Sequence, residues 1–384
     1  MNKQSLSVVM PNYNHAHYLR DALPSILKQS VRPDEFFVVD DGSTDESVDI
    51  LKEYAKRDPL VRLICNDRNR GGHFSVERGL SLCTSEYMFT LAVDDLILPE
   101  FIEKEMNLLA NYPQAGLCMS DFSCFNDETG KQVAKKHRLS DVPRYFSPDE
   151  LACVIKGDHI AAITSILKRS AVIEAGGFLE SLKWYSDWFT NLVVGFRYGV
   201  CYIPEDLGTI RVLSQSYSGA GTQDPIQQQQ VFQHLLSLLK SSKYQDVFPY
   251  FVRGKVMNHF GEEVVHAVLK SPEHWDIPTL LLINYPFWQW SRKTQGNTMS
   301  ASLFYQYSMF EKNIESLMTC SDPQLARACL SESLALCMGL VQQYPQLIDA
   351  YLALAFVHTA LGDHLRAVEV LLMAISRFPL NVHV

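Results

Sequence analysis

The first hundred residues alternate between apolar runs and amphipathic segments. Residues 36–39 are continuously apolar and residues 6–10 are apolar except at Ser7, which is typical of parallel strands covered on both faces. Residues 17–29, between them, carry leucine and isoleucine at helical spacing. A third strand is predicted at 61–65, and a further helix is predicted over roughly 74–83. This alternation predicts an α/β fold with a mostly parallel, doubly wound sheet.

The next apolar run, residues 87–93, ends abruptly in two adjacent carboxylates, Asp94 and Asp95. The strand predicted there brings both to the carboxyl edge of the sheet, where open α/β sheets bind their ligands. Adjacent carboxylates suit a divalent cation that holds phosphates, because hard cations take oxygen ligands. The plainer alternative is an aspartate-rich turn that caps the next helix, whose first turn would hold Pro99.

Two earlier strands also end in polar residues. The first is followed by Pro11-Asn12-Tyr13-Asn14 and the second by Asp40-Asp41-Gly42-Ser43-Thr44-Asp45. We expect the three polar strand ends to line one edge of the sheet, where a nucleotide could lie. The sequence has no G-x-G-x-x-G after the first strand and no P-loop motif, which disfavours dinucleotide binding and P-loop chemistry.

These segments resemble the family 2 glycosyltransferases of the GT-A fold. The resemblance rests on four motifs: residues 7–14, residues 39–45, Val93-Asp94-Asp95 before Leu98-Pro99, and Ala175-Gly176-Gly177-Phe178 followed by Trp184-Tyr185-Ser186-Asp187-Trp188. The motifs stand in the family's order and spacing and cover about residues 5–218. The resemblance implies a nucleotide-sugar donor, usually linked to UDP, and a Rossmann-like GT-A sheet.

The resemblance also implies roles on the donor side. Pro11 and Tyr13 would line the base pocket, and Asp41 would hydrogen-bond the base, usually uracil. Asn69 and Arg70 would lie near the donor.

Asp94 would be the metal-binding member of the family's D-x-D motif, with Mg²⁺ or Mn²⁺ as the cation. Asp187 would be the general base that activates the acceptor hydroxyl in an inverting transfer. The chemistry agrees, because a sugar hydroxyl needs a proton acceptor during in-line attack. Asp95, Trp184 and Trp188 are further candidates for contact with donor or acceptor, since aromatic rings stack on sugars. The alternative role of Asp187 is an N-cap for a helix at 188–198.

Three positions depart from the family pattern. Ala92 replaces the first aspartate of D-x-D, Ser186 replaces the glutamate that usually precedes the base, and Leu213 stands where some members carry histidine. Asp94 would then share the cation only with diphosphate and water. The alternative function is a catalytically degraded GT-A domain that serves as an interaction scaffold.

The second half of the chain has a helical pattern from Pro225 onward. Tyr344-Pro345 and Phe378-Pro379 lie one tetratricopeptide period apart, with a helix predicted before them at roughly 331–343. We therefore expect a GT-A domain over 1–220, a helical extension over 221–300 and TPR-like helix pairs over 301–384. Such repeats would bind a protein partner or the acceptor, or pair two copies of the chain as a homodimer.

Composition narrows the class of protein. The 384 residues are 47% hydrophobic and 20% charged with a net charge of −9, so we expect a globular protein that does not bind nucleic acid. Nine cysteines without a C-x-x-C pair favour a reducing compartment. No segment reaches the roughly 20 apolar residues of a membrane span. We expect a cytoplasmic protein, with a peripheral position on the inner face of a membrane as the alternative.

Overall fold

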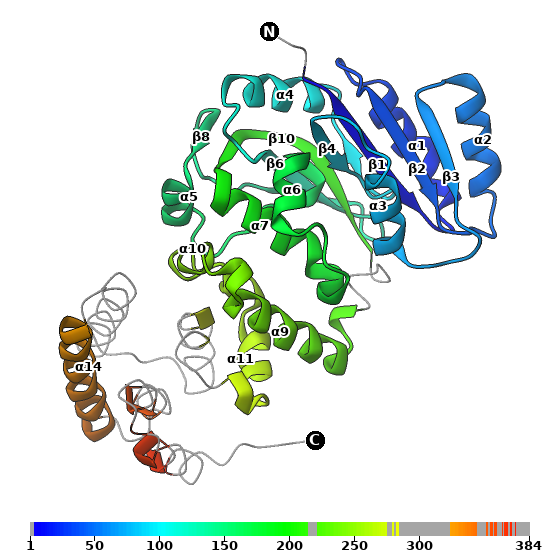
Figure 1. Cartoon of the computed structure of the whole chain (residues 1–384). Coiled ribbons are helices and arrows are strands. Elements are labelled where there is room, and N and C mark those ends of the chain that lie inside the picture. The colour runs from blue at the N-terminus through cyan, green and yellow to red at the C-terminus, as the bar shows by residue number, and fades with distance from the viewer. Residues whose placement is uncertain are drawn as a thin grey trace. The chain divides into compact units, whose positions relative to one another are not determined.

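The computed structural model describes residues 4–213, 221–274, 279, 282–283 and 323–343, with scattered positions between 351 and 373. The chain divides into two compact units, Met1–His234 and Leu235–Val384 (Figure 1). The first unit holds the sheet and every residue that the sequence singled out for chemistry.

A sheet of ten strands forms the centre of the first unit. Its strands are β1 (Leu6–Asn12), β2 (Glu35–Asp40), β3 (Val61–Cys65), β4 (Tyr87–Thr90), β5 (Leu96–Ile97), β6 (Leu117–Asn126), β7 (Lys131–Lys135), β8 (Arg144–Phe146), β9 (Ser165–Lys168) and β10 (Val200–Val212). The main path is β3-β2-β1-β4-β9-β6-β10-β5. Strands β1 to β4, β6 and β10 run in one direction, because β9 is antiparallel to both β4 and β6. The expected α/β fold with a mostly parallel sheet is confirmed, and β9 interrupts the parallel order in the middle.

Helices cover both faces of this sheet (Figure 1). They are α1 (Ala16–Leu27), α2 (Ser47–Arg57), α3 (Gly72–Leu80), α4 (Phe101–Asn111), α5 (Pro148–Val154), α6 (Arg169–Ala175) and α7 (Ser186–Tyr198). On one face, Val8 of β1 packs in the same buried cluster as Leu19 and Leu23 of α1. On the other face, a Cβ added to Gly79 of α3 would lie 2.4 Å from Val9. Burial on both sides therefore explains why β1 is largely apolar.

Two strands differ from the sequence-based prediction. Strand β4 ends at Thr90 rather than near Asp94, because the chain turns there and the Asp95 N–H donates to the Ala92 carbonyl at 3.0 Å. Residues 200–203 and 209–212, predicted as two strands, form the single strand β10, whose register with β6 shifts on either side of Asp206. Such bulges let one strand bend and continue past an irregular stretch.

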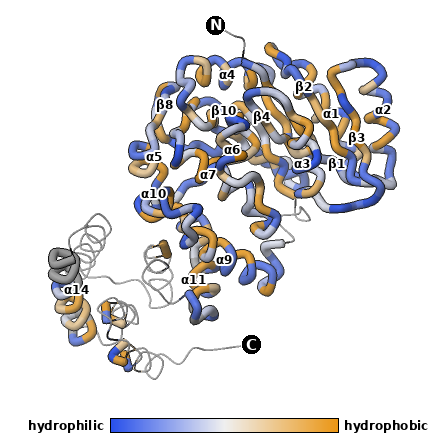
Figure 2. Tube along the Cα trace, viewed as in Figure 1, coloured by the Kyte–Doolittle hydropathy of each residue, from blue (hydrophilic) through white to orange (hydrophobic). Residues whose placement is uncertain are grey.

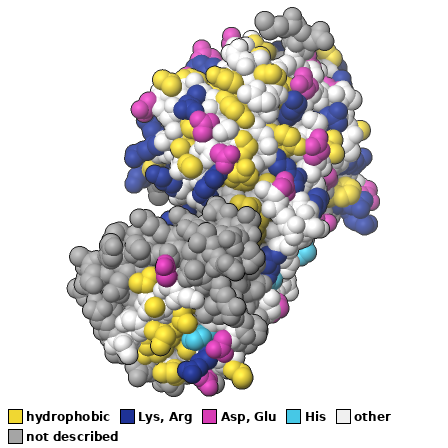
Figure 3. Space-filling model, turned by 60° about the vertical axis from the view of Figure 1, so that its left-hand side comes forward, with side chains coloured by type: hydrophobic (Ala, Val, Ile, Leu, Met, Phe, Trp, Pro, Cys, Tyr) yellow, Lys and Arg dark blue, Asp and Glu magenta, His cyan; other side chains and the backbone are white. Residues whose placement is uncertain are grey.

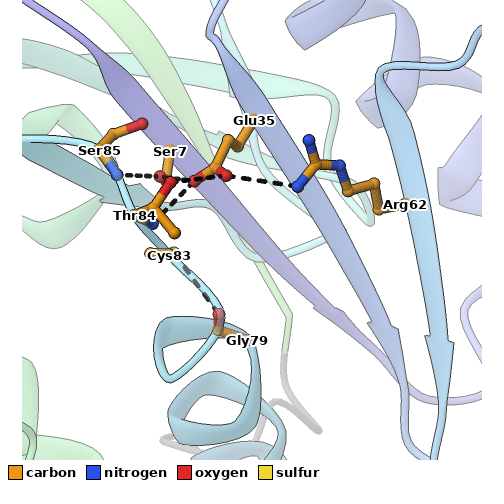
Figure 4. A network of polar contacts seen from close by, with 7 residues as sticks. All are labelled: Ser7, Glu35, Arg62, Gly79, Cys83, Thr84 and Ser85. Atoms are coloured by element: carbon orange, nitrogen blue, oxygen red, sulfur yellow. Dashed lines mark hydrogen bonds and ion pairs between the residues drawn. The ribbon is translucent and has the colours of Figure 1, made fainter.

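The amino-terminal end of β2 carries a buried polar network (Figure 4). The Glu35 carboxylate accepts hydrogen bonds from the Ser7 hydroxyl at 2.6 Å and from the Thr84 N–H at 2.9 Å, and it pairs with Arg62 at 3.3 Å. Burial opposes ionisation, but these hydrogen bonds outweigh it and lower the pKa of Glu35. The network joins β1, β2, β3 and the segment before β4. It lies at the opposite edge of the sheet from the polar residues that follow β1 and β2.

The described part beyond the sheet is helical, as predicted. It includes α9 (Pro225–Lys240), α10 (Phe248–Arg253), α11 (Glu262–Leu269) and α14 (Pro323–Gln343), whose tubes alternate between hydrophobic and hydrophilic residues (Figure 2). Helix α14 includes the predicted segment 331–343. The two Tyr-Pro and Phe-Pro positions that define the TPR-like repeat lie outside the described residues. No helix of the described residues is both long enough and apolar enough to cross a membrane.

Candidate active site at the carboxyl edge of the sheet

The ends of β1 and β2 meet because the two strands are parallel neighbours. Asn12 pairs in register with Asp40, and its side-chain amide donates to the Asp40 carboxylate at 2.8 Å. The Asp41 N–H donates to the Asn12 carbonyl at 2.8 Å. This pairing brings the predicted residues Pro11 and Tyr13 to the same edge as Asp41, with Tyr13 exposed.

Asp41 is buried, and described residues already bind both of its carboxylate oxygens. Oδ1 accepts hydrogen bonds from the Asn66 side chain at 2.6 Å and the Arg70 N–H at 3.0 Å, and Oδ2 accepts one from the Gly71 N–H at 2.7 Å. Asp41 thus holds the segment that carries the predicted residues Asn69 and Arg70. The close approach also requires Gly42, because a Cβ there would lie 2.6 Å from the Arg68 backbone.

Asp40, which sequence reasoning did not select, organises the same edge. It is fully buried and accepts hydrogen bonds from Asn12, from the Ser43 N–H at 2.9 Å and from the Ser43 hydroxyl at 2.6 Å. The sequence signal that could have identified Asp40 was its position directly after the apolar run 36–39. Its role is to fix the turn that carries Asp41.

Asp94 and Asp95 differ in their surroundings although they are adjacent. Asp95 Oδ1 accepts the Arg211 N–H of β10 at 3.0 Å, and burial together with the charge of Asp94 raises the pKa of Asp95. Within the described part of the chain, no hydrogen bond reaches the half-buried Asp94 carboxylate. Asp94 is therefore the member of the pair available to a ligand.

Arg211 lies beside the Asp94-Asp95 pair, although the sequence motifs did not select it. Its guanidinium pairs with Asp127 at 3.1 Å and Asp21 at 3.4 Å and lies over the Tyr18 ring at 5.0 Å. Burial, the Asp127 carboxylate and the charge of Asp94 all contribute to raising the pKa of Tyr18. Tyr18 and Arg211 thus stand in the same electrostatic neighbourhood as Asp94. An arginine in the last residues of a late strand was the available signal.

Asp187 lies in the first turn of α7, which begins at Ser186 and not at 188 as predicted. The residue at the N-cap position is Tyr185, so Asp187 is not the N-cap. Its Oδ1 accepts the N–H of Trp188 at 2.8 Å. Burial raises the pKa of Asp187, while the Trp188 N–H and the charge of His159 partly oppose this effect. A carboxylate with a raised pKa is a stronger proton acceptor.

The two tryptophans near Asp187 have different surroundings. Trp188 is 5% exposed and belongs to the interior, so its ring does not offer a face for a sugar. Trp184 is partly buried, and its indole N–H donates to the Gln228 side chain at 3.1 Å. The four consecutive glutamines, which the sequence suggested to be a plain polar helix face, therefore include a residue that contacts the acceptor-side motif.

A carboxylate between two imidazoles lies near Asp187. Asp158 is 2.8 Å from His137 Nδ1 and 3.2 Å from His159 Nδ1. Asn191, one turn after Asp187 on α7, donates to the Ile160 carbonyl at 3.2 Å, which holds this segment against the helix. Nothing in the sequence pattern pointed to Asp158, His137 or His159.

Comparison with known proteins identifies the family. The family model for glycosyl transferase family 2 matches residues 7–174. TuaG of Bacillus subtilis, whose name assigns it to teichuronic acid biosynthesis, is 32% identical over 222 residues, which are 56% of this chain and 82% of that protein. The chain belongs to glycosyl transferase family 2.

Two further relatives, both named as uncharacterized glycosyltransferases, match about half of this chain. The uncharacterized glycosyltransferase YibD of Escherichia coli is 35% identical over 197 residues, 48% of this chain and 56% of YibD. MJ1057 of Methanocaldococcus jannaschii is 25% identical over 209 residues, 52% of this chain and 69% of MJ1057. The chain therefore spans only part of the length of these relatives.

A solved structure of the S. aureus TarS fragment 1–349, in complex with UDP-GlcNAc, shares the fold. The TM-score is 0.50 at 15% sequence identity, over 77% of this chain and 93% of the fragment. The resemblance to family 2 glycosyltransferases that the motifs predicted is confirmed by these findings.

The charged side chains on one face of the molecule are shown in Figure 3. Acidic and basic side chains are interspersed on the described part of this face.

Proposed function

We propose that this glycosyltransferase transfers a sugar from a UDP-linked donor to an acceptor hydroxyl and inverts the anomeric carbon, with Asp187 as the general base. The observation that carries the proposal is the environment of Asp187, a half-buried carboxylate of raised pKa in the acceptor-side motif of the family. The TarS complex with UDP-GlcNAc supports the choice of donor. The acceptor would be a hydroxyl on a glycan, a lipid-linked sugar or a protein.

The reaction follows from one carboxylate acting on one hydroxyl. The acceptor O–H bond breaks as Asp187 takes the proton, and the oxygen forms a bond to the anomeric carbon while the bond to UDP breaks. A single displacement from the face opposite the leaving group inverts the configuration. Retention would need a nucleophilic carboxylate or another mechanism that attacks from the face of the leaving group.

The residues at the donor edge fit a divalent cation, Mg²⁺ or Mn²⁺, only as a site shared with the substrate. No group of three or more His, Cys, Asp or Glu side chains in the described residues could hold a metal ion. Asp94 would hold the cation together with the diphosphate, as Mg²⁺ sites commonly combine one or two carboxylates with phosphates. The bound cation would offset the charge of the leaving diphosphate. Arg211 would add positive charge beside Asp94.

We assign the remaining predicted donor contacts on the same basis. Pro11, Tyr13 and Asp41 would form the base pocket, with Asn69 and Arg70 in the segment that Asp41 holds. The helical residues 221–300 and 301–384 would support the enzyme and bind the acceptor or a partner. The reaction would take place in the cytoplasm.

The test is Asp187→Asn, which keeps the shape of the side chain but removes its ability to take a proton. We expect transfer to fall by roughly 10²–10⁴-fold, with unchanged UDP affinity by calorimetry and an inverted anomeric centre in the parental product by NMR. The control is Asp149→Asn, an exposed aspartate in the first turn of α5. A near-parental rate for Asp187→Asn, or a retained anomeric centre, would contradict the proposal.

A further inference from the structure

Two glutamines at the start of α9 contact the segment that leads into Asp187. That segment is the last part of a 3-10 helix, Glu180–Tyr185. Within it, Lys183 has φ 47° and ψ −120°. A positive φ is uncommon for a residue with a Cβ. The Lys183 ammonium donates to the Gln227 side chain, which ties this unusual backbone position to α9.

Gln228 binds the next two residues with both ends of its amide. Its Oε1 accepts the Trp184 indole N–H at 3.1 Å, and its Nε2 donates to the Tyr185 hydroxyl at 2.7 Å. The side chain is 6% exposed. The indole can only donate, so the orientation of the amide is fixed. Because Gln228 is buried and both contacts are partly buried, losing these hydrogen bonds costs more than losing fully exposed ones would.

Other residues at and just before the start of α9 also support the segment that contains Trp184 and Tyr185. The Asp224 carboxylate accepts the N–H groups of Ile226 at 3.0 Å and Gln227 at 3.1 Å, which fixes the start of the helix. The Phe232 ring stacks on the Tyr185 ring, with centroids 5.8 Å apart. A Cβ at Gly221 would lie 2.2 Å from the Trp184 ring, so the backbone there passes directly against the indole.

These contacts matter because Tyr185 is the N-cap residue, directly before α7 begins at Ser186. Asp187 follows two residues later, inside the first turn of a rigid helix whose remaining residues are largely buried. Where Tyr185 is held therefore determines where the Asp187 carboxylate lies. General-base catalysis is sensitive to such placement, and an error of about 1 Å can reduce a rate by about 10²-fold.

We propose that Gln228 is a positioning residue of the transfer reaction, holding Trp184 and Tyr185 so that Asp187 faces the acceptor hydroxyl. The inference rests on the proposed role of Asp187. Gln228 itself touches neither substrate nor the reacting atoms. Its loss should therefore lower kcat without changing the affinity for the donor.

The test compares Gln228→Met with Gln228→Glu. Methionine keeps the volume but makes neither hydrogen bond, whereas a glutamate carboxylate can accept from both the indole N–H and the phenol O–H. We expect kcat for UDP release from UDP-GlcNAc with acceptor to fall about 10- to 100-fold in Gln228→Met and to recover largely in Gln228→Glu. The matched control is Gln230→Met, an exposed glutamine two residues further along α9, which should keep the parental kcat.

Two readouts separate positioning from general loss of structure. The UDP dissociation constant, measured by calorimetry, should stay within about twofold of the parental value. The Trp184 indole N–H signal, assigned with Trp184→Phe, should shift and exchange faster with solvent in Gln228→Met only. If Gln228→Met does not fold, Tyr185→Phe removes one of the two hydrogen bonds and should give a smaller kcat loss with intact UDP binding.

The outcomes distinguish this inference from the proposed function. If Asp187→Asn is inactive but Gln228→Met and Tyr185→Phe retain parental kcat, Gln228 does not position the base and the proposed function stands. A matching loss of kcat in Gln228→Met and Gln230→Met would also overturn the inference. If Asp187→Asn transfers at the parental rate, the base is wrong and the positioning role falls with it.

Discussion

The Gly71 N–H donates to the Asp41 carboxylate at 2.7 Å, across a gap of thirty residues in sequence. Asp41 directly follows β2, and Gly71 directly precedes α3, so one buried side chain connects two of the loops at the candidate donor edge. A nucleotide bound there would meet a surface whose shape depends on this contact.

We expect Asp41→Ala to weaken UDP binding by about 10- to 100-fold, with or without a divalent cation. Hydrogen bonds to a charged group contribute about 1.5–3 kcal/mol, and the 66–71 segment would lose its anchor. Calorimetry with UDP measures the effect. Asp67→Ala, an exposed aspartate on the same segment, is the control and should bind UDP normally. An unchanged dissociation constant for Asp41→Ala would remove this residue from the donor site.

Asp94→Asn should remove the dependence of UDP binding on a divalent cation. The amide oxygen keeps the shape but lacks the charge that holds the cation against the diphosphate. We expect Mn²⁺ to strengthen UDP binding in the parent and to have little effect in the variant, as measured by calorimetry with and without the ion. Glu100→Gln, at an exposed position shortly after the site, provides the comparison. Equal stimulation by Mn²⁺ in parent and Asp94→Asn would show that Asp94 does not bind the cation.

The pH dependence of transfer should depend on His159. A general base must be ionised, so activity falls as pH falls through the pKa of Asp187. The charge of His159 lowers that pKa, and His159→Gln therefore should raise it. We expect the acid limb of the kcat profile to move to higher pH in His159→Gln and to stay in place in His266→Gln, whose side chain is exposed on α11. An acid limb that does not move, or moves to lower pH, would contradict this coupling.

Asp158 should stabilise the fold in a pH-dependent way. Burial opposes its ionisation, but the hydrogen bonds with His137 and His159 outweigh this and lower its pKa. A carboxyl with a lowered folded-state pKa contributes stability above its unfolded pKa, near 4, and loses that contribution as pH falls below it. Urea unfolding should therefore show Asp158→Asn less stable than the parent at pH 7, with a difference that shrinks below about pH 4. If the stability difference between parent and Asp158→Asn grew as the pH fell, the prediction would be contradicted.

The local pattern of the sequence was sufficient to predict the separate strands at the candidate donor edge and the polar residues that follow them. Largely apolar runs predicted β1 and β2, because strands that are buried on both faces have few polar positions. The segment that forms β3 was also predicted as a strand, although its Arg62 is exposed. The abrupt change to polar residues at Asp41 and Asp94 predicted where a ligand would bind, since parallel strands bring their ends together. Spacing and order of the motifs then gave the family.

Only the tertiary structure decided which distant side chains meet. The antiparallel strand β9 between β4 and β6, the Arg211–Asp95 hydrogen bond and the Gln228–Trp184 hydrogen bond each join segments far apart in sequence. Local composition records whether a residue is buried and with what periodicity, but not its partner. Partners depend on how helices and strands pack, and a buried polar side chain such as Gln228 is distinguished from its exposed neighbours only by that packing.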